Sequence, residues 1–320
     1  MVNIIIPAYN AHETIRQAIS SVAMQDDLDN ILLTIVDDYS DEPYDYLIDD
    51  FHYMNIEILR KPSNTGCGQA RQYGIDRCNC EYMMFLDADD CLHSPNAVTK
   101  LLFHMEDEHL DFAWSAFGEE MDNGDYVLHE NNGVWMHGKI YRTKYIKEHD
   151  IRFSETRLNE DHSFNILVVL SGGKNLYIDY ITYIWKYYVK SLTRSNNFKS
   201  YVDSLEDYMI NAEYAISELL KRNIEEEKII TIIKEYILSF YKYCNILFTK
   251  EDCETQLKKY KGLIRKFYIN LPCNFKPKLT KEFLVENFYE SDSIDAIIND
   301  NILFNMTFDN YYMIFDNISK

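Results

Sequence analysis

The sequence predicts an α/β fold, in which a sheet is flanked by helices, followed by an α-helical C-terminal region. In the first part of the chain, short apolar runs alternate with segments of helical periodicity, which indicates strands joined by crossover helices. After about residue 200, the strand-like runs end and long amphipathic segments follow. We therefore expect two domains, formed by residues 1–195 and residues 196–320.

Strands are expected where β-branched or apolar runs end at polar residues or proline, in residues 2–6, 31–36, 56–59 and 82–86. Helices are expected in residues 10–23 and 68–77 and, farther on, in residues 201–222, 225–248 and 283–315. Strands that alternate with helices predict a mostly parallel sheet. In such a sheet, ligands bind beyond the carboxyl ends of the strands.

The composition is that of a folded and acidic protein. A formal net charge of −20 argues against a general affinity for nucleic acid or anionic surfaces. No apolar run approaches the ~20 residues that a membrane span requires, and polar residues interrupt the N-terminus before a signal-peptide core forms. The seven cysteines include no CxxC pair, so reduced thiols in a cytoplasmic protein are expected.

The segment Phe85-Leu86-Asp87-Ala88-Asp89-Asp90 is the most informative in the chain, because its carboxylates directly follow an expected buried strand. Alternate residues of an extended segment point the same way, so Asp87 and Asp89 are expected to face one ligand. Two hard oxygen ligands at this spacing suit Mg²⁺ or Mn²⁺, which bind substrate phosphates at their remaining positions. For an isolated pair of this kind, an acidic turn or a helix cap is the alternative.

Two further polar segments follow expected strands and are expected at the same edge of the sheet. The turn Pro7-Ala8-Tyr9 offers backbone groups and an aromatic face to a nucleobase. Asp37 or Asp38 can accept a hydrogen bond from the ring N–H of uracil, which favours a uridine nucleotide. A pair of ordinary turn residues is the alternative for these two acids.

Arg71 and the pair Glu160-Asp161 are the remaining charged candidates. Arg71 follows Gly66 and Gly68, where the chain can approach a ligand closely, and its guanidinium can bridge to a carboxylate of the site or to a diphosphate. Glu160-Asp161 opens an apolar helix, where a carboxylate tends to remain ionised and ready to accept a proton. A surface arginine and a helix cap are the alternatives.

Six motifs occur in order in the first part of the chain: residues 4–10 (IIIPAYN), 35–41 (IVDDYSD), 64–74 (NTGCGQARQYG), 85–90 (FLDADD), 138–142 (GKIYR) and 160–161 (ED). Together they resemble the inverting glycosyltransferases of family 2, which have the GT-A fold. The resemblance covers roughly residues 1–195, and the helical remainder carries no motif of this family.

The resemblance implies a Rossmann-like mixed sheet and the transfer of a hexose or N-acetylhexosamine from a UDP-sugar to an acceptor hydroxyl, with inversion. It implies that Asp161 is the general base and that Asp89 is the principal ligand of Mn²⁺ or Mg²⁺. Asp87 would be a further ligand or would contact the ribose or a metal-bound water, and Asp90 would lie behind them. The residues expected to bind the donor are Pro7, Ala8, Tyr9, Asp37, Asp38, Asn64, Gly66, Arg71, Asp87, Ala88 and Arg194.

The resemblance also implies a glycan or lipid-linked acceptor in bacterial polysaccharide synthesis, and a cytoplasmic protein with peripheral contact at the inner face of the membrane. His137, residues 185–188 (WKYY) and residues 191–194 (SLTR) are further site candidates. Lys190 or Arg194 is placed to close over the diphosphate as part of a mobile loop. A structural aromatic cluster with a solvated basic tail is the alternative.

Three competing hypotheses remain. A phospho-receiver domain also has an acid pair after a strand, but here a complete strand and helix precede Asp37-Asp38. A sugar nucleotidyltransferase usually has a Gly-rich basic loop after its first strand, and Pro7-Ala8-Tyr9-Asn10 is not one. A non-catalytic relative that only binds a nucleotide sugar is disfavoured by the presence of both Asp89 and Asp161.

The C-terminal helices need a partner to pack against, which would be the catalytic domain, one another or a second subunit in a homo-oligomer. A plain structural helical domain is the simplest interpretation. A basic stretch interrupts this acidic chain: Lys258, Lys259, Lys261, Arg265, Lys266, Lys276, Lys278 and Lys281. A membrane surface that carries a lipid-linked acceptor is one anionic partner for this stretch.

Overall fold

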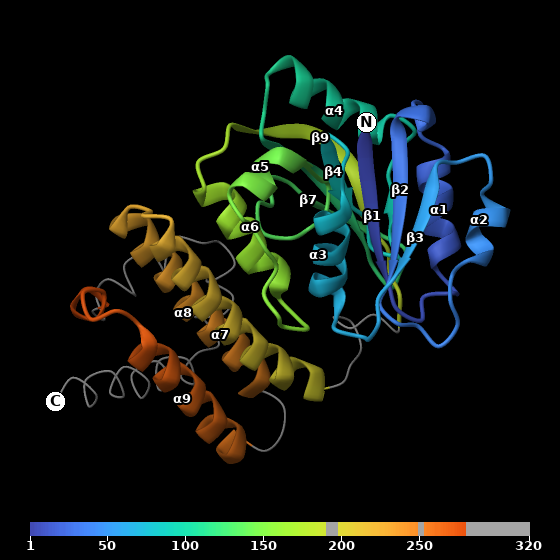
Figure 1. Cartoon of the computed structure of the whole chain (residues 1–320). Helices are drawn as coiled ribbons and strands as arrows, with labels where there is room; N and C mark the ends of the chain where they lie inside the picture. The colour runs from blue at the N-terminus through green and yellow to red at the C-terminus, as the bar shows by residue number, and fades with distance from the viewer. Residues whose placement is uncertain (190–197, 249–252, 280–320) are drawn as a thin grey trace. The chain divides into compact units, whose positions relative to one another are not determined.

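The computed structural model describes residues 1–189, 198–248 and 253–279, and it divides into two compact units (Figure 1). The unit Met1–Ser195 is a mixed α/β sheet with flanking helices, and the unit Asn196–Lys320 is helical in its described part. The predicted fold class is thereby confirmed. Lys190, Arg194, Lys281 and the helix expected in residues 283–315 lie outside the described residues.

The strands of the first unit form one nine-stranded sheet in the order β3-β2-β1-β4-β8-β6-β9-β5, with β7 paired to β6. The strands are β1 (Val2–Ala8), β2 (Ile31–Asp37), β3 (Ile56–Arg60), β4 (Tyr82–Phe85), β5 (Cys91–Leu92), β6 (Phe112–Glu120), β7 (Tyr126–His129), β8 (Lys139–Arg142) and β9 (Asn175–Trp185). All seven residues of β1 are buried, as expected of a central strand that is covered on both faces.

The strands up to Phe85 run parallel, as the sequence predicts. β1 runs parallel to β2 and β4, and β2 runs parallel to β3, because crossover helices return the chain to the same edge. β8 is antiparallel to β4 and β6, and β5 is antiparallel to β9. β9 runs parallel to β6. The sheet is therefore mixed, as the resemblance implied, and the prediction of a mostly parallel sheet is wrong for β5, β7 and β8.

The helices of this unit are α1 (Ile15–Ala23), α2 (Tyr46–Asp50), α3 (Cys67–Arg77), α4 (Ala97–Asp107), α5 (Thr143–Glu148) and α6 (Glu160–Leu170). The helix predicted from residue 10 begins only at Ile15. Asn10 has a φ of 49°, which places it in the left-handed region and excludes it from a right-handed helix.

Alternate residues of β1 face opposite layers of helices. Val2, Ile4 and Ile6 share one buried core with α1 and α4. Ile5 faces the other layer, where α3 approaches through Gly74. Because β1, β2 and β4 are parallel, their carboxyl ends lie at the same end of the sheet.

The second unit contains α7 (Phe198–Lys221), α8 (Glu226–Phe248) and α9 (Cys253–Asn270), so the helices predicted in residues 201–222 and 225–248 are confirmed. Buried residues of α7 recur at helical spacing, and the rings of Tyr208 and Tyr236 lie 5.2 Å apart between α7 and α8. Among the described helices, none combines the length and the apolar character needed to cross a membrane.

Part of the basic stretch is neutralised within the helical unit. Lys259 lies 3.3 Å from Glu206, and Lys278 lies 2.9 Å from Glu226. Arg265 is exposed. Contact of this stretch with an anionic membrane stays a prediction.

The variant Gly74→Ala tests the packing of α3 on β1. The added methyl group would lie 2.7 Å from Cγ2 of Ile5, a buried β-branched side chain with little rotamer freedom. Overpacking of this kind costs about 1–3 kcal/mol and outweighs the ~1 kcal/mol that alanine gains over glycine in a helix. We expect a melting temperature lower by roughly 2–4 °C per kcal/mol of net loss.

Gly262→Ala in α9 is the matched control, because no described atom lies within 4 Å of the methyl group that it adds. Its melting temperature should stay the same or rise slightly. An unchanged melting temperature for Gly74→Ala would contradict the close approach of α3 to β1.

Candidate functional site

The acids after β4 lie in a tight turn rather than in an extended segment. β4 ends at Phe85, and the backbone N–H of Asp90 donates to the carbonyl oxygen of Asp87 at 3.1 Å. The turn brings positions 87 and 90 together, so the prediction that Asp87 and Asp89 share one face of an extended chain is wrong. Asp89 is half-buried in the same turn, and its role as a metal ligand stays a prediction.

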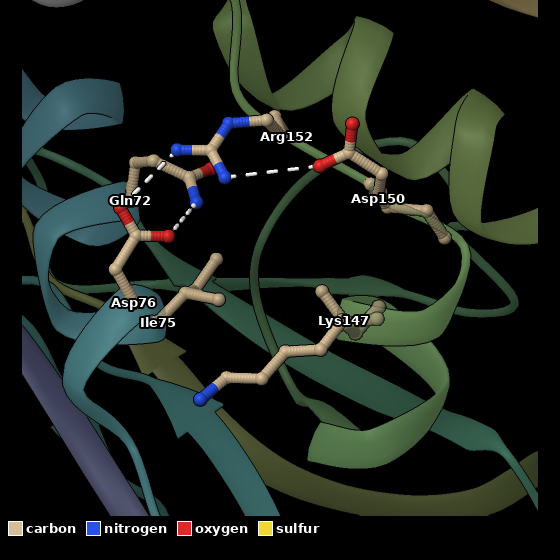
Figure 2. Close-up of a pocket in the computed structure, with 8 residues that line it drawn as sticks. Gln72, Ile75, Asp76, Lys147, Asp150 and Arg152 are labelled. Atoms are coloured by element: carbon tan, nitrogen blue, oxygen red, sulfur yellow. Dashed lines mark hydrogen bonds and ion pairs between the residues drawn. The ribbon is translucent and has the colours of Figure 1, made fainter.

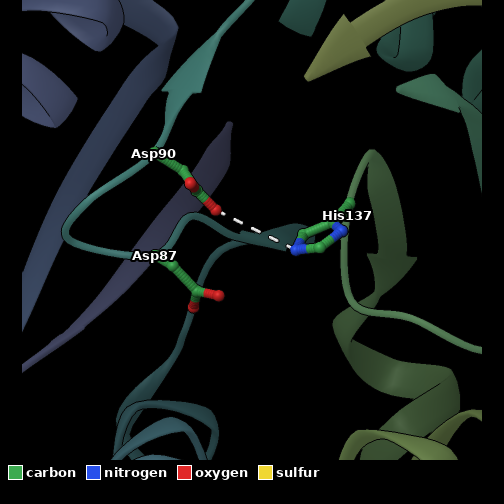
Figure 3. A group of neighbouring side chains, drawn as sticks. All are labelled: Asp87, Asp90 and His137. Atoms are coloured by element: carbon green, nitrogen blue, oxygen red, sulfur yellow. Dashed lines mark ion pairs between the residues drawn. The ribbon is translucent and has the colours of Figure 1, made fainter. Parts of the chain in front are cut away.

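Asp87, Asp90 and His137 form a cluster that fits a divalent cation. Each offers one ligand atom, and these atoms all lie within 4.8 Å of one another (Figure 3). His137 comes from the segment before β8, and its Nε2 lies 3.9 Å from Oδ2 of Asp90. Two carboxylates with an imidazole suit Mn²⁺ in particular, since carboxylates favour Mn²⁺ and Mg²⁺ while imidazole favours transition metals.

The ionisation of these groups supports the fit. Burial lowers the pKa of His137 to about 3, so its imidazole is neutral at neutral pH, as a metal ligand must be. Its Nδ1 is buried without a hydrogen-bond partner among the described residues. Burial and the charges of Asp87 and Asp89 hold the pKa of Asp90 well above its usual range. A bound cation would offset this crowding of negative charge.

Asp90 is held in place by two donors from β9 and the residue after it. The hydroxyl of Tyr183 donates to Oδ2 at 2.6 Å, and the backbone N–H of Lys186 donates to Oδ1 at 2.9 Å. The same tyrosine oxygen accepts a hydrogen bond from the backbone N–H of Asp87 at 3.2 Å. The end of β9 therefore positions the turn that carries the acids.

Arg71 links this turn to the start of α6. Its guanidinium is buried and donates to Oδ1 of Asp87 at 2.6 Å and to Oε1 of Glu160 at 2.9 Å. Burial acts to raise the pKa of Asp87, but the charge of Arg71, the interaction with His137 and the hydrogen bond from Arg71 together hold this pKa below its usual value. Gly68 makes room for the link, because a methyl group at position 68 would lie 2.4 Å from Cγ of Glu160.

The two acids that open α6 have different surroundings. Glu160 is buried against Arg71, and burial raises its pKa to about 7. Asp161 is half-buried, which leaves it more accessible to a ligand than Glu160. Burial and the charge of Asp87 raise its pKa, while Arg71 and Lys139 act to lower it. The expectation that the helix N-terminus alone keeps this carboxylate ionised is therefore incomplete.

Lys139 is a buried cation at the start of β8. Its Nζ donates to the carbonyl oxygen of Asn132 at 2.8 Å. Burial lowers the pKa of this amine to about 7, and the negative charge of Asp161 acts in the opposite direction. Below neutral pH the lysine is therefore a positive charge in the neighbourhood of Asp161.

Asp37 ends β2 and Asp38 follows it, and both carboxylates are held by protein contacts. Asp37 pairs with Arg60. Asp38 accepts from Nζ of Lys61 at 2.7 Å and from the backbone N–H of Gly66 at 2.7 Å. The backbone N–H of Thr65 also donates to Oδ1 of Asp38 at 3.1 Å, and both aspartates are buried. Their contact with a uracil ring stays a prediction.

The other expected donor residues lie along the same edge. Pro7 and Ala8 are buried at the end of β1, and Tyr9 is exposed directly after it. Asn64 accepts a hydrogen bond from Arg157 at 3.1 Å, and Ala88 is buried within the acidic turn. Their contact with a nucleotide also stays a prediction.

Aromatic rings surround His137, and among them the sequence singled out only Trp185, in residues 185–188. The ring of His137 lies 4.7 Å from that of Phe117, 4.8 Å from Tyr183 and 5.3 Å from Trp185. Trp135 packs edge-on against Trp185 at 5.5 Å. These residues come from distant parts of the chain, so no local pattern predicts that they meet around one imidazole.

A separate pocket lies at the far end of α3. It is lined by Gln72, Ile75 and Asp76 from that helix and by the chain from Ile146 to Arg152 (Figure 2). Arg152 fills part of it and lies 3.1 Å from Asp76 and 3.8 Å from Asp150. Both acids that line this pocket are thus paired with Arg152, and the pocket is not the candidate site.

Comparison with known proteins points to one family. The family model described as Glycosyl transferase family 2 matches residues 3–162. The chain is 22% identical over 258 residues to the poly(ribitol-phosphate) beta-N-acetylglucosaminyltransferase TarS of Staphylococcus aureus, over 75% of this chain and 44% of TarS. It is 26% identical over 261 residues to the teichoic acid poly(glycerol phosphate) polymerase of Staphylococcus epidermidis, over 74% of this chain and 32% of that protein. The chain thus spans less than half the length of these relatives.

Solved structures show the same fold. Residues 1–349 of S. aureus TarS in complex with UDP-GlcNAc match with a TM-score of 0.75 and 19% identity, over 99% of this chain and 91% of that one. A mannosyltransferase from Pyrobaculum calidifontis in complex with GDP-Man and Mn²⁺ matches with a TM-score of 0.51 and 10% identity, over 91% and 88%. The GT-A-like fold is thereby confirmed, and the receiver and nucleotidyltransferase hypotheses are set aside.

Titration with Mn²⁺ in the absence of nucleotide tests the cation cluster. Replacing His137 by alanine or Asp90 by asparagine removes one ligand atom, and we expect each change to weaken Mn²⁺ binding by about 10-fold or more. The signal of free Mn²⁺ in electron paramagnetic resonance measures the binding. Asp89→Ala in the same experiment reports whether Asp89 is a ligand as well.

His93→Ala is the control, since His93 is exposed in the loop after β5. It should bind Mn²⁺ as the wild type does. Wild-type affinity in the His137→Ala variant would remove the imidazole from the ligand set.

Proposed function

We propose that this chain, which belongs to glycosyltransferase family 2, transfers a hexose or N-acetylhexosamine from a UDP-sugar to an acceptor hydroxyl with inversion. In this proposal residues 1–195 form the catalytic domain and residues 196–320 form a helical domain. The observation that carries it is the contact of Arg71 with both Asp87 and Glu160. This contact brings the acids of the turn after β4 and the acids at the start of α6 to one place, which supports a site where a cation and a general base act on one donor.

UDP-GlcNAc is the donor that we would test first. TarS, which shares the fold, has been solved with UDP-GlcNAc. In this chain, the uridine would lie at the ends of β1 and β2, near Tyr9 and the Asp37-Asp38 pair. The diphosphate would lie toward Asp87, Asp89 and Asp90.

The chemistry assigned to Asp161 is that of a general base. It would take the proton of the acceptor hydroxyl as the acceptor oxygen bonds to the anomeric carbon. The bond from that carbon to the diphosphate breaks on the opposite side, and UDP departs with the electron pair. Attack in line with the leaving group inverts the configuration at the anomeric carbon.

Asp87, Asp90 and His137, together with Asp89 if it is a ligand, would hold Mn²⁺ or Mg²⁺ beside the diphosphate. When bound, the cation supplies Lewis-acid stabilisation of the charge on the departing UDP. Arg71 keeps Asp87 ionised and oriented toward that position. Tyr183 and the backbone of Lys186 fix the orientation of Asp90.

For the acceptor we propose only a chemical class. The two relatives above are named as enzymes of poly(ribitol-phosphate) and of teichoic acid. A hydroxyl of a bacterial surface polymer or of its lipid-linked precursor is therefore the acceptor that we favour. A membrane-bound precursor would give the basic stretch of the helical domain an anionic surface to contact.

Release of UDP from a panel of UDP-sugars, with Mn²⁺ and with EDTA, tests the proposal. A UDP-sugar transferase releases UDP from at least one donor, and EDTA abolishes the release. Binding of UDP without release from any donor, even with polyol-phosphate acceptors, would instead identify a non-catalytic relative.

Asp161→Asn tests the general base. The amide keeps the shape of the carboxylate but cannot accept the proton, so kcat should fall by on the order of 10² or more. The affinity for the UDP-sugar, measured by calorimetry, should be nearly unchanged. A collapse of donor affinity, with turnover of the bound donor retained, would mean that Asp161 has another role.

The raised pKa of Asp161 also predicts a pH dependence. A base acts in its ionised form, so kcat is retained above this pKa and lost as the pH falls through it. The acid limb of the pH profile should therefore lie above pH ~4, the value for an ordinary aspartate. Lys139→Met removes a charge that acts to lower this pKa, and it should move the limb to higher pH.

The profile is measured as kcat at saturating donor. Lys147→Met is the control, because Nζ of Lys147 donates to the carbonyl oxygen of Cys78, away from the acids. An acid limb at the same pH in the wild type and in Lys139→Met would contradict the electrostatic role of Lys139.

A further inference from the structure

Two exposed tyrosines follow the carboxyl ends of the neighbouring strands β1 and β2, where the proposed function places the uridine of the donor. Tyr9 follows β1 and Tyr39 follows β2 closely, and each is 52% exposed. In the parallel pair β1–β2, Ala8 lies opposite Asp37, and the backbone N–H of Asp38 donates to the carbonyl oxygen of Ala8 at 2.8 Å. The two tyrosines therefore follow adjoining strand ends at the carboxyl end of the sheet.

The two loops that carry these rings are joined by side-chain hydrogen bonds. The backbone N–H of Asn10 donates to Oγ of Ser40 at 3.0 Å. The side chain of Asn10 also donates to Asp41 at 3.1 Å and accepts from the backbone N–H of Asp41 at 3.0 Å. The relative position of the loops is thus set before any ligand binds.

Tyr39 has a backbone conformation that bulky residues rarely adopt. Its φ is 67°, in the left-handed region, and the backbone N–H of Ser40 is fixed by Oδ1 of Asp37 at 2.8 Å. The guanidinium of Arg60 pairs with Asp37, donates to the carbonyl oxygen of Ser40 at 2.7 Å and lies 5.2 Å from the centre of the Tyr39 ring. The left-handed backbone and the contact of the ring with Arg60 together fix Tyr39 at the carboxyl end of β2.

We propose that Tyr39 binds the nucleobase of the donor by stacking, as a second aromatic wall beside Tyr9. The proposal rests on the proposed function, because it names a further residue of the same donor site. Position 39 is the x of the VDDxSxD pattern, so the ring is a contribution of this chain rather than of the motif. Stacking supplies affinity for the base, while Asp37 and Asp38 are the acceptors that can select uracil.

The test is binding of UDP and of inorganic pyrophosphate, each with Mn²⁺, measured by calorimetry without turnover. Tyr39→Asn removes the ring but keeps a residue that tolerates the left-handed backbone. We expect its affinity for UDP to fall by about 10-fold, the size typical of a lost base-stacking contact. Its affinity for pyrophosphate, which has no base, should be unchanged. Tyr39→Phe should bind UDP as the wild type does.

Tyr53→Asn is the matched control. Tyr53 is 58% exposed but precedes β3, so it lies at the amino end of that parallel strand and not at the carboxyl end, where Tyr39 lies. Wild-type UDP affinity in Tyr39→Asn, or an equal loss for UDP and pyrophosphate, would overturn the proposal while leaving the proposed function intact. If the wild type binds no UDP with Mn²⁺, the proposed function fails and this inference fails with it.

Discussion

A single buried guanidinium holds the candidate site together. Arg71 donates to Asp87 at 2.6 Å and to Glu160 at 2.9 Å, and without it Glu160 in its ionised form would be a buried and uncompensated charge. The two contacts fix where α3, the turn after β4 and the start of α6 meet. They also explain why position 68 is glycine, since a methyl group there would lie 2.4 Å from Cγ of Glu160. One ion-pair network thus determines both local packing and the geometry of the acids.

Arg71 does not balance the charge around it. The acids gathered near it are Asp87, Asp89, Asp90, Glu160 and Asp161, and the cations that affect their ionisation are Arg71 and Lys139. Burial, together with the excess of acids, raises the pKa values of Asp90, Glu160 and Asp161. A divalent cation at Asp87, Asp90 and His137 would favour their ionised forms, so cation binding would release protons and strengthen as the pH rises. Binding of the cation would then favour the ionised form of Asp161 through electrostatic interaction, without any direct contact.

The sequence predicts the central strands well and the later ones poorly. β1, β2 and β4 are continuous apolar runs because helices cover both faces of the sheet, and each run ends at a recognisable turn. β6 is mostly buried and β9 only partly, and their register shifts at Ser115–Ala116, so neither has a regular alternation of buried and exposed residues that a sequence pattern could reveal. The proximity of His137 to Asp90 could not be predicted from the sequence for a different reason. It depends on a turn at positions 87–90 and on a segment far along the chain.

Glu160 and Asp161 illustrate what a sequence leaves undecided. They are adjacent carboxylates at one helix start, and the helix dipole favours both equally. Successive residues of a helix project about 100° apart, so only one of them can face α3. The chain directs Glu160 there, where Gly68 leaves space and Arg71 provides the partner, and Asp161 is left half-buried. Gly68 and Arg71, on another helix about ninety residues earlier in the chain, therefore determine that Glu160 is the buried acid and Asp161 the accessible one.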